Sequence, residues 1–123
     1  MRGLGILLIS GGHERAHYAL VLATGAAAIG RPVTLFATNG GVALLLAARP
    51  LEADPREAAI AARGVAGIGM LLEAAQELGV ALMVCDTGRI AEGLADAALL
   101  PGVEISGVVG FLAASAGGQL ISL

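Results

Sequence analysis

The chain has 123 residues, of which 57% are hydrophobic and only 14% are charged, and its formal net charge is -3. It contains no lysine, and its arginines form no basic cluster. This excludes nucleic acid as the main ligand, because the neutralisation of phosphates requires Lys and Arg. A chain of this length buries a core without disulfides or a structural metal, and we predict a single domain over residues 1–123.

The high apolar content raises the question of a membrane segment. The longest uncharged run, residues 105–123, is interrupted by serines, glycines and a glutamine, and it predicts a helix, a turn and a strand rather than a span. The apolar stretch near the N-terminus is too short for a signal peptide. We therefore expect a cytoplasmic protein with no membrane partner, in which a single cysteine stays reduced. The excess apolar surface predicts a homo-oligomer.

The first part of the chain predicts a strand, a helix and a second strand. The apolar runs Leu4–Ile9 and Val33–Ala37 predict the strands, and the Ala-rich residues 13–29, followed by Gly30, predict the helix. A short helix is expected over residues 42–48. Neither strand alternates apolar with polar residues, which is typical of a parallel sheet covered on both faces.

The middle of the chain predicts more helices. Residues 49–54 are the one loop expected to be mobile. Asp54, Pro55 and Glu57 predict the start of a helix that ends at Gly64, since they supply an N-cap, a first-turn proline and a capping-box acid. Residues 66–78 have apolar side chains on one face and predict an amphipathic helix packed on the sheet.

The last part of the chain predicts strands at Val80–Val84, Val103–Ile105 and Leu120–Leu123, with helices over residues 89–95 and 107–115 between them. The complete order, β-α-β-α-α-α-β-α-β-α-β, predicts an α/β fold with three layers.

Three loops that follow predicted strands share one chemistry. They read Ser10-Gly11-Gly12-His13, Thr38-Asn39-Gly40-Gly41 and Cys85-Asp86-Thr87-Gly88. In an open parallel sheet, ligands bind beyond the carboxyl ends of the strands, and free N–H groups at helix starts hold an anion or stabilise a thiolate. The same residue types also make ordinary tight turns. The candidate environment of Cys85 comprises Ser10, Gly11, Gly12, His13, Asn39, Gly40, Asp86, Thr87, Gly88 and Arg89.

Cys85 is the sole cysteine. A helix start and the nearby Arg89 would lower the pKa of its thiol, whereas the Asp86 carboxylate would raise it. A structural role remains an alternative, because free cysteines are often buried like small hydrophobic residues. With one thiol the chain forms no internal disulfide, so any sulfur or redox chemistry must be completed by a partner.

His13 and His17 belong to an HExxH sequence, the zinc-protease pattern. A catalytic zinc needs a third protein ligand, no third histidine exists, and the motif begins directly after a loop, so a metalloprotease is disfavoured. A metal site that uses both histidines and Cys85, or activation of the thiol by a histidine, is the alternative. We favour histidines at a helix start that are solvated or satisfied by other groups, and we predict no cofactor.

Two glycine pairs resemble fragments of nucleotide-binding motifs. Gly67-Ile68-Gly69 lacks the third glycine and follows no strand, whereas Gly3 and Gly5 precede or begin the first strand instead of following it. A phosphate-binding loop of the lysine type is impossible without lysine. Both pairs are interpreted as packing glycines.

Four stretches resemble a known family, the DsrE/DsrF/DsrH-like sulfur-relay proteins, which include the TusD-type subunits. They are LLISGGHERAHYALVLATGAAAIGRPVTLFATNGG, LLEAAQELGVALMVCDTG, AEGLADAALLPGVEISGVVGFLAAS and the closing GQLISL. The resemblance implies a three-layer α/β/α fold with a parallel five-stranded sheet, and homo- or hetero-oligomers. It also implies a cysteine that carries sulfur as a persulfide between proteins, a role that maps onto Cys85 alone.

The favoured hypothesis is therefore a sulfurtransferase-type carrier without independent turnover, which receives sulfane sulfur from a protein donor on Cys85 and passes it to an acceptor. The alternative is a non-catalytic oligomeric binding module, with a pocket for a small anion or ligand at the carboxyl edge of the sheet. A metal site at His13 and His17 is the third hypothesis.

Overall fold

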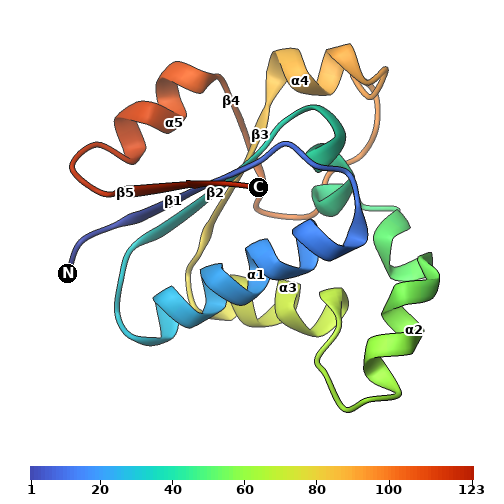
Figure 1. Ribbon diagram of the computed structural model, residues 1–123. Helices are drawn as coiled ribbons and strands as arrows, with labels where there is room; N and C mark the ends of the chain where they lie inside the picture. The colour runs from blue at the N-terminus through green and yellow to red at the C-terminus, as the bar shows by residue number, and fades with distance from the viewer.

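The computed structural model describes all residues, 1–123, and its centre is a five-stranded parallel sheet. The strand order is β4-β3-β2-β1-β5 (Figure 1). The strands are β1 (Leu4–Leu8), β2 (Val33–Ala37), β3 (Ala81–Cys85), β4 (Glu104–Ser106) and β5 (Gln119–Ser122). This confirms the predicted α/β fold with a parallel five-stranded sheet.

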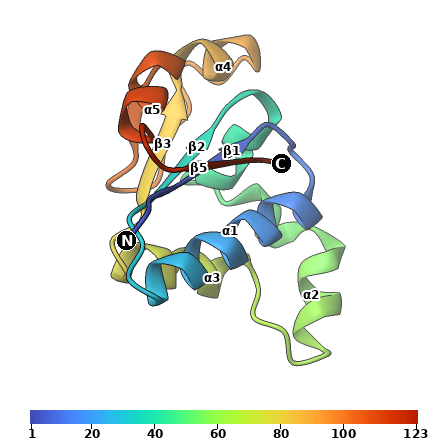
Figure 2. The same cartoon turned by 60° about the vertical axis from the view of Figure 1, so that its left-hand side comes forward.

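Helices cover both faces of the sheet (Figure 2). α1 and α3 lie side by side on one face, and α5 lies on the other, while α4 continues directly from the end of β3. The α-helices are α1 (His13–Ala28), α2 (Pro55–Ala61), α3 (Ile68–Glu77), α4 (Asp86–Ala91) and α5 (Val108–Ala114), and the 3-10 helices are η1 (Asn39–Leu45) and η2 (Pro50–Ala53). α1 is the longest, with 16 residues, and none of the helices combines the length and apolar character that crossing a membrane requires.

Two predicted helices are placed differently by the structure. The helix expected over residues 42–48 is the 3-10 helix η1, which begins at Asn39, directly after the loop residue Thr38. Gly41 approaches the Leu8 carbonyl so closely that no side chain fits there, and this contact folds η1 back onto the end of β1. The helix expected over 89–95 is α4, which begins at Asp86 because Cys85 itself serves as its N-cap. Within the loop expected to be mobile, residues 50–53 form η2.

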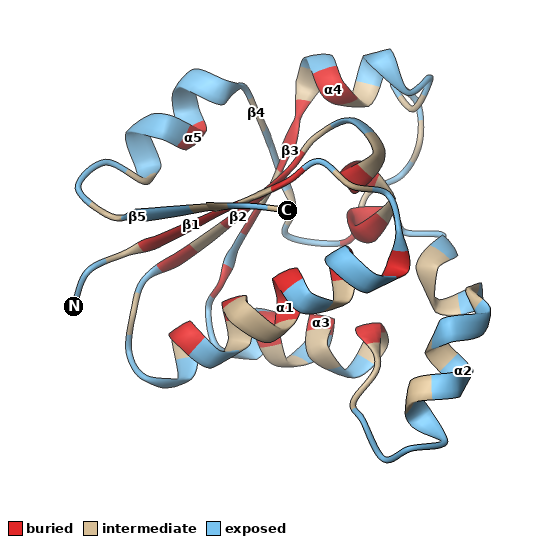
Figure 3. Ribbon diagram, in the orientation of Figure 1, coloured by how far each residue is buried: buried red, intermediate tan, exposed pale blue.

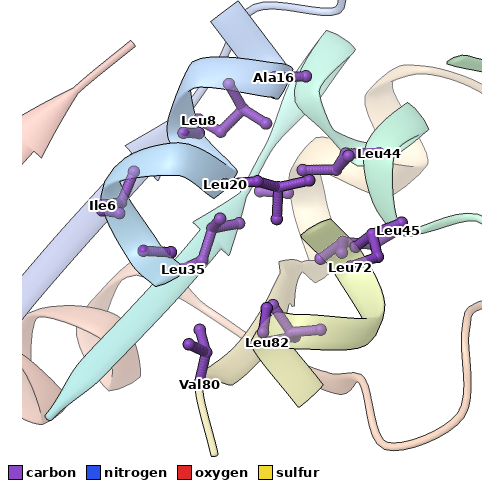
Figure 4. Close-up of a cluster of buried hydrophobic side chains, with 14 of the residues drawn as sticks. Ile6, Leu8, Ala16, Leu20, Leu35, Leu44, Leu45, Leu72, Val80 and Leu82 are labelled. Atoms are coloured by element: carbon purple, nitrogen blue, oxygen red, sulfur yellow. The ribbon is translucent and has the colours of Figure 1, made fainter. Parts of the chain in front are cut away.

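The two faces of the sheet carry cores of very different size. Successive strand residues alternate between the faces, so Leu82 and Val84 join the large core under α1 and α3, whereas Met83 and Cys85 face α5. The large core contains 22 buried residues (Figures 3 and 4). The core on the α5 face contains only Phe36, Cys85 and Phe111. The single thiol is therefore located on the thinly covered face.

Candidate functional site

The loops that follow β1, β2 and β3 meet at one edge of the sheet (Figure 1). A Cβ atom at Gly11 would lie 3.0 Å from the Gly40 carbonyl oxygen, and one at Gly88 would lie 2.7 Å from the Asn39 backbone nitrogen. A side chain at Gly88 would have to displace the Asn39 backbone, and one at Gly11 would crowd the Gly40 backbone. The structure thus brings Gly11, Gly40, Asn39 and Gly88 together, as the loop sequences predict.

Cys85 lies at the junction of β3 and α4, and its side chain is only 6% exposed. The Gly88 N–H donates to Sγ with an N–S distance of 3.4 Å. The Thr87 hydroxyl lies 3.3 Å from Sγ. The Thr38 hydroxyl, which donates to Asn39 Oδ1 at 3.0 Å, is also close enough to the sulfur to lower the pKa of the thiol. The sulfur is therefore surrounded by its own turn and by the residue that follows the neighbouring strand β2.

These hydrogen bonds decide the acidity of the thiol. Burial raises the pKa of Cys85, but the Thr87 and Thr38 hydroxyls and the Gly88 and Thr87 N–H groups together lower this pKa below its ordinary value of 9.0. Hydrogen bonds to the charged form favour it over the neutral form. The arrangement stabilises a thiolate, which is the reactive form of cysteine.

Thr38 is the contributor that the sequence-based residue set omits. It follows β2 directly, and β2 pairs with β3 over Thr34–Ala37 and Ala81–Val84. The sequence feature that could have identified Thr38 is its position at the carboxyl end of a strand. Its placement near Cys85, however, depends on the order of the strands in the sheet.

Arg89 and Asp86 interact with each other. Arg89 Nη2 donates to Asp86 Oδ1 at 2.8 Å, and Nη1 donates to the Ala95 carbonyl. The guanidinium is thus used to fix the α4 turn and the segment that follows it. Hydroxyl and amide groups, and not the expected arginine, stabilise the thiolate.

Ser10 and Gly12 shape the start of α1. Ser10 Oγ accepts a hydrogen bond from the Gly12 N–H at 3.3 Å, and Gly12 is the N-cap of α1. This is the ordinary turn role that the sequence left open for these residues.

His13 and His17 lie outside the cysteine environment. Both belong to α1, which packs on the face of the sheet opposite to Cys85. His13 Nε2 lies 2.7 Å from Glu57 Oε1, and His17 Nε2 donates to the Ala66 carbonyl at 2.8 Å. The prediction that His13 lies beside the thiol is therefore wrong. No group of three or more His, Cys, Asp or Glu side chains is arranged to hold a metal ion.

The surface has two hollows, and neither is lined by the three loops. The first has a volume of about 190 Å³ and is almost entirely apolar; it is lined by Leu7, Val108, Phe111, Leu112, Leu120, Ile121 and Ser122. Neither hollow lies at the carboxyl edge of the sheet, where the alternative hypothesis expects a pocket for a small anion. The apolar hollow adjoins the small core that contains the thiol, because Phe111 belongs to that core and Leu7 packs against it.

Comparisons with known proteins agree with this fold. A search of curated proteins gives no match. Among solved structures, the crystal structure of the ychN protein from E. coli is similar, with a TM-score of 0.68 and 18% sequence identity over 100% of both chains. At this identity the likeness shows the shared fold. The model of the DsrE/DsrF-like family matches residues 4–121, and the chain therefore belongs to the DsrE/DsrF-like family.

Proposed function

We propose that this DsrE-like protein is a sulfur carrier that holds sulfane sulfur as a persulfide on Cys85. The observation that carries the proposal is the set of hydrogen bonds to Cys85 Sγ, which lowers the pKa of the thiol although the residue is buried. Family membership supports the same chemistry. Because Cys85 is the sole cysteine, both the donor and the acceptor of sulfur are other molecules.

The proposed transfer balances without an added oxidant. The Cys85 thiolate attacks the outer sulfur of a donor persulfide, a new S–S bond forms, and the donor's own S–S bond breaks. The donor leaves as a thiolate, and the outer sulfur keeps its proton. In the second step an acceptor thiolate attacks the outer sulfur of the Cys85 persulfide, and Cys85 returns to the thiolate that Gly88, Thr87 and Thr38 stabilise.

The mass of the intact protein tests this proposal. After incubation with polysulfide, or with a cysteine desulfurase and cysteine, we expect a gain of one sulfur atom that a small thiol reverses. The Cys85→Ser variant is the matched control and should gain nothing. Wild-type protein that remains unmodified under both conditions would contradict the proposal.

One observation favours the alternative, a binding module in which Cys85 only packs. Cys85 is only 6% exposed and belongs to the small core with Phe36 and Phe111, so little of the residue is open to a donor. Reaction of the native thiol with a small alkylating reagent distinguishes the sulfur carrier from the binding module. A rate close to that of a free thiol supports the carrier, whereas protection that persists until global unfolding supports the packed cysteine.

We further propose that the protein is a homo-oligomer assembled through α5 and β5. The small core on this face leaves apolar side chains exposed, among them Val109 at 77%, and also Val108, Leu112 and Leu120. No charged residue occurs after Glu104, and the nearby charges of Arg2 and Arg31 lie at the start of β5, where they donate to Gly118 and Gln119. Contiguous apolar surface of this kind marks an interface.

Sedimentation velocity tests the assembly. We expect a species larger than the 12.1 kDa chain, and Leu112→Asp should shift it towards the monomer. Met70→Asp, a change at an exposed apolar residue on α3, is the matched control and should leave the assembly intact. A wild-type monomer would contradict this part of the proposal. A carrier with one reduced thiol also fits the cytoplasm, where such thiols persist.

A further inference from the structure

Residues 50–66, here called the arm, project from the α1 and α3 side of the protein (Figures 1 and 2). The arm contains η2, α2 and the segment that returns to α3. None of its residues is buried, so α2 is a helix without a core of its own (Figure 3). Leu51, which is half-buried, is the arm's packing contact with the large core. Elements with so little buried apolar surface belong to the least stable part of a fold.

The two histidines of the HExxH sequence contact both limbs of the arm, which are the helix α2 and the segment that returns from it to α3. Their rings lie on one face of α1 because they are four residues apart, and they stack with centroids 5.8 Å apart. His13 Nε2 contacts Glu57 Oε1 at 2.7 Å, on the outgoing helix α2. His17 Nε2 donates to the Ala66 carbonyl at 2.8 Å, on the returning segment.

Glu57 also joins the arm to α3. Its carboxylate accepts the Ile68 N–H, with both oxygens 3.0 Å from the nitrogen. A side chain at residue 67 would displace this carboxylate, because a Cβ at Gly67 would lie 2.7 Å from Glu57 Oε2. Gly69 leaves room for the Glu52 carboxylate in the same way. The Gly67-Ile68-Gly69 sequence thus makes space for two acidic side chains of the arm.

We propose that the arm opens and closes on the body of the protein as one unit, and that the His13–Glu57 and His17–Ala66 contacts form the clamp that keeps it closed. The HExxH sequence is then a conformational device instead of a metal site. Opening separates α2 from α1 and exposes the His13 side chain and the start of α3, where His13 and Ile68 are now 3% and 1% exposed.

Amide hydrogen exchange on the full chain, read by mass spectrometry, tests the clamp at each end. Glu57→Gln removes the charge that His13 and the Ile68 N–H contact, and His17→Phe keeps a stacked ring but removes the donor to Ala66. Loss of a hydrogen bond raises the population of the open arm by roughly two-fold to more than ten-fold, with the larger values for a bond to a charged group. We expect either variant to speed exchange across the whole arm by a factor in this range, with the arm still exchanging well before β1, β2 and β3.

The matched control is Glu73→Gln, which removes the same charge from the exposed face of α3 and should leave exchange in the arm unchanged. The proposal is overturned if each variant affects only its own limb, if neither differs from the control, or if the arm exchanges together with the strands. The thermal midpoint of each variant shows whether it has folded. If one variant does not fold, the other still tests the proposal. Faster exchange over the whole arm then indicates one unit, and faster exchange in one limb alone indicates two independent contacts.

Discussion

Thr38 and Gly88 lie side by side at the carboxyl edge of the sheet, so closely that a Cβ at residue 88 would collide with the Thr38 hydroxyl. This contact joins the loop after β2 to the first turn of α4. It also brings the hydroxyl group of Thr38, which directly follows β2, close to Cys85 Sγ. The acidity of the thiol is thus a property of two strands, and the first two predictions follow from it.

Gly88→Ala should raise the pKa of Cys85 and destabilise the protein. The new methyl group meets the Asn39 backbone nitrogen at 2.7 Å, and backbone atoms cannot rotate away, so the α4 turn and its N–H donor to Sγ must shift. Overpacking of this kind costs about 1–3 kcal/mol. Urea unfolding measures the stability, and the pH dependence of alkylation measures the pKa.

Gly25→Ala is the control for this change. Gly25 lies inside α1 with nothing within 4 Å of its absent Cβ, so alanine there should stabilise the protein by about 0.5–1 kcal/mol through helix propensity. It should leave the pKa of the thiol as it is. An unchanged pKa in Gly88→Ala would show that the turn does not stabilise the thiolate.

Thr38→Val should also raise the pKa of Cys85, because the substitution removes a hydroxyl that stabilises the thiolate and keeps the side-chain shape. Near neutral pH, the alkylation rate should fall by about three- to ten-fold, since each pKa unit is a factor of ten in thiolate below the pKa. Thr38→Ser keeps the hydroxyl and should behave like the wild type. Equal rates for the valine and serine variants would exclude a role for the Thr38 hydroxyl.

Phe111→Ala should expose Cys85. The Phe111 ring stacks on Phe36 with centroids 4.7 Å apart, and the two rings and the thiol form the small core under α5. Loss of the ring should cost about 3–5 kcal/mol. At a pH where the thiol is fully ionised in both proteins, the variant should be alkylated faster than the wild type, because the two proteins then differ only in the access of the reagent to the sulfur.

Phe111→Leu fills most of the same space and should retain most of the protection. A Phe111→Ala variant that stays folded and reacts no faster than the wild type would place the route to the sulfur elsewhere, on the side of the loop after β2.

Acid should weaken the protein partly through Glu57. Burial raises the pKa of its carboxyl, but the hydrogen bonds from His13 and from the Ile68 and Gly69 N–H groups, with the charge of His13, lower it below its ordinary value of 4.5. The unfolded chain therefore binds the proton more readily. The stability that this carboxylate contributes is complete above about pH 4.5 and is lost as the pH falls through the lower pKa of the folded state.

Urea unfolding of wild type and Glu57→Gln at neutral and acidic pH measures this effect. At neutral pH the wild type should be more stable by about 1–2 kcal/mol, and the difference should shrink towards zero in acid. A difference that stays constant between the two pH values would exclude the titration of Glu57 as its source.

Local sequence patterns predicted most of the secondary structure because apolar runs, caps and glycines act over a few residues. The strand Val33–Ala37 was predicted with its observed bounds, and Asp54 caps α2 through the Arg56 N–H as expected. The β3 boundary was wrong by one residue. Cys85 is the last strand residue because its backbone still pairs with Ser106, while its side chain caps α4.

The sequence by itself therefore determined the α/β class, the parallel sheet and the position of the single thiol at a strand end. Only the tertiary structure decided which groups surround that thiol. Strand order places Thr38 beside Cys85, and the layer in which α1 lies directs His13 towards Glu57 on the opposite face. The physical reason is that helix caps and strand burial depend on neighbours in the chain, whereas the acidity of a thiol depends on hydrogen bonds from residues that are distant in sequence.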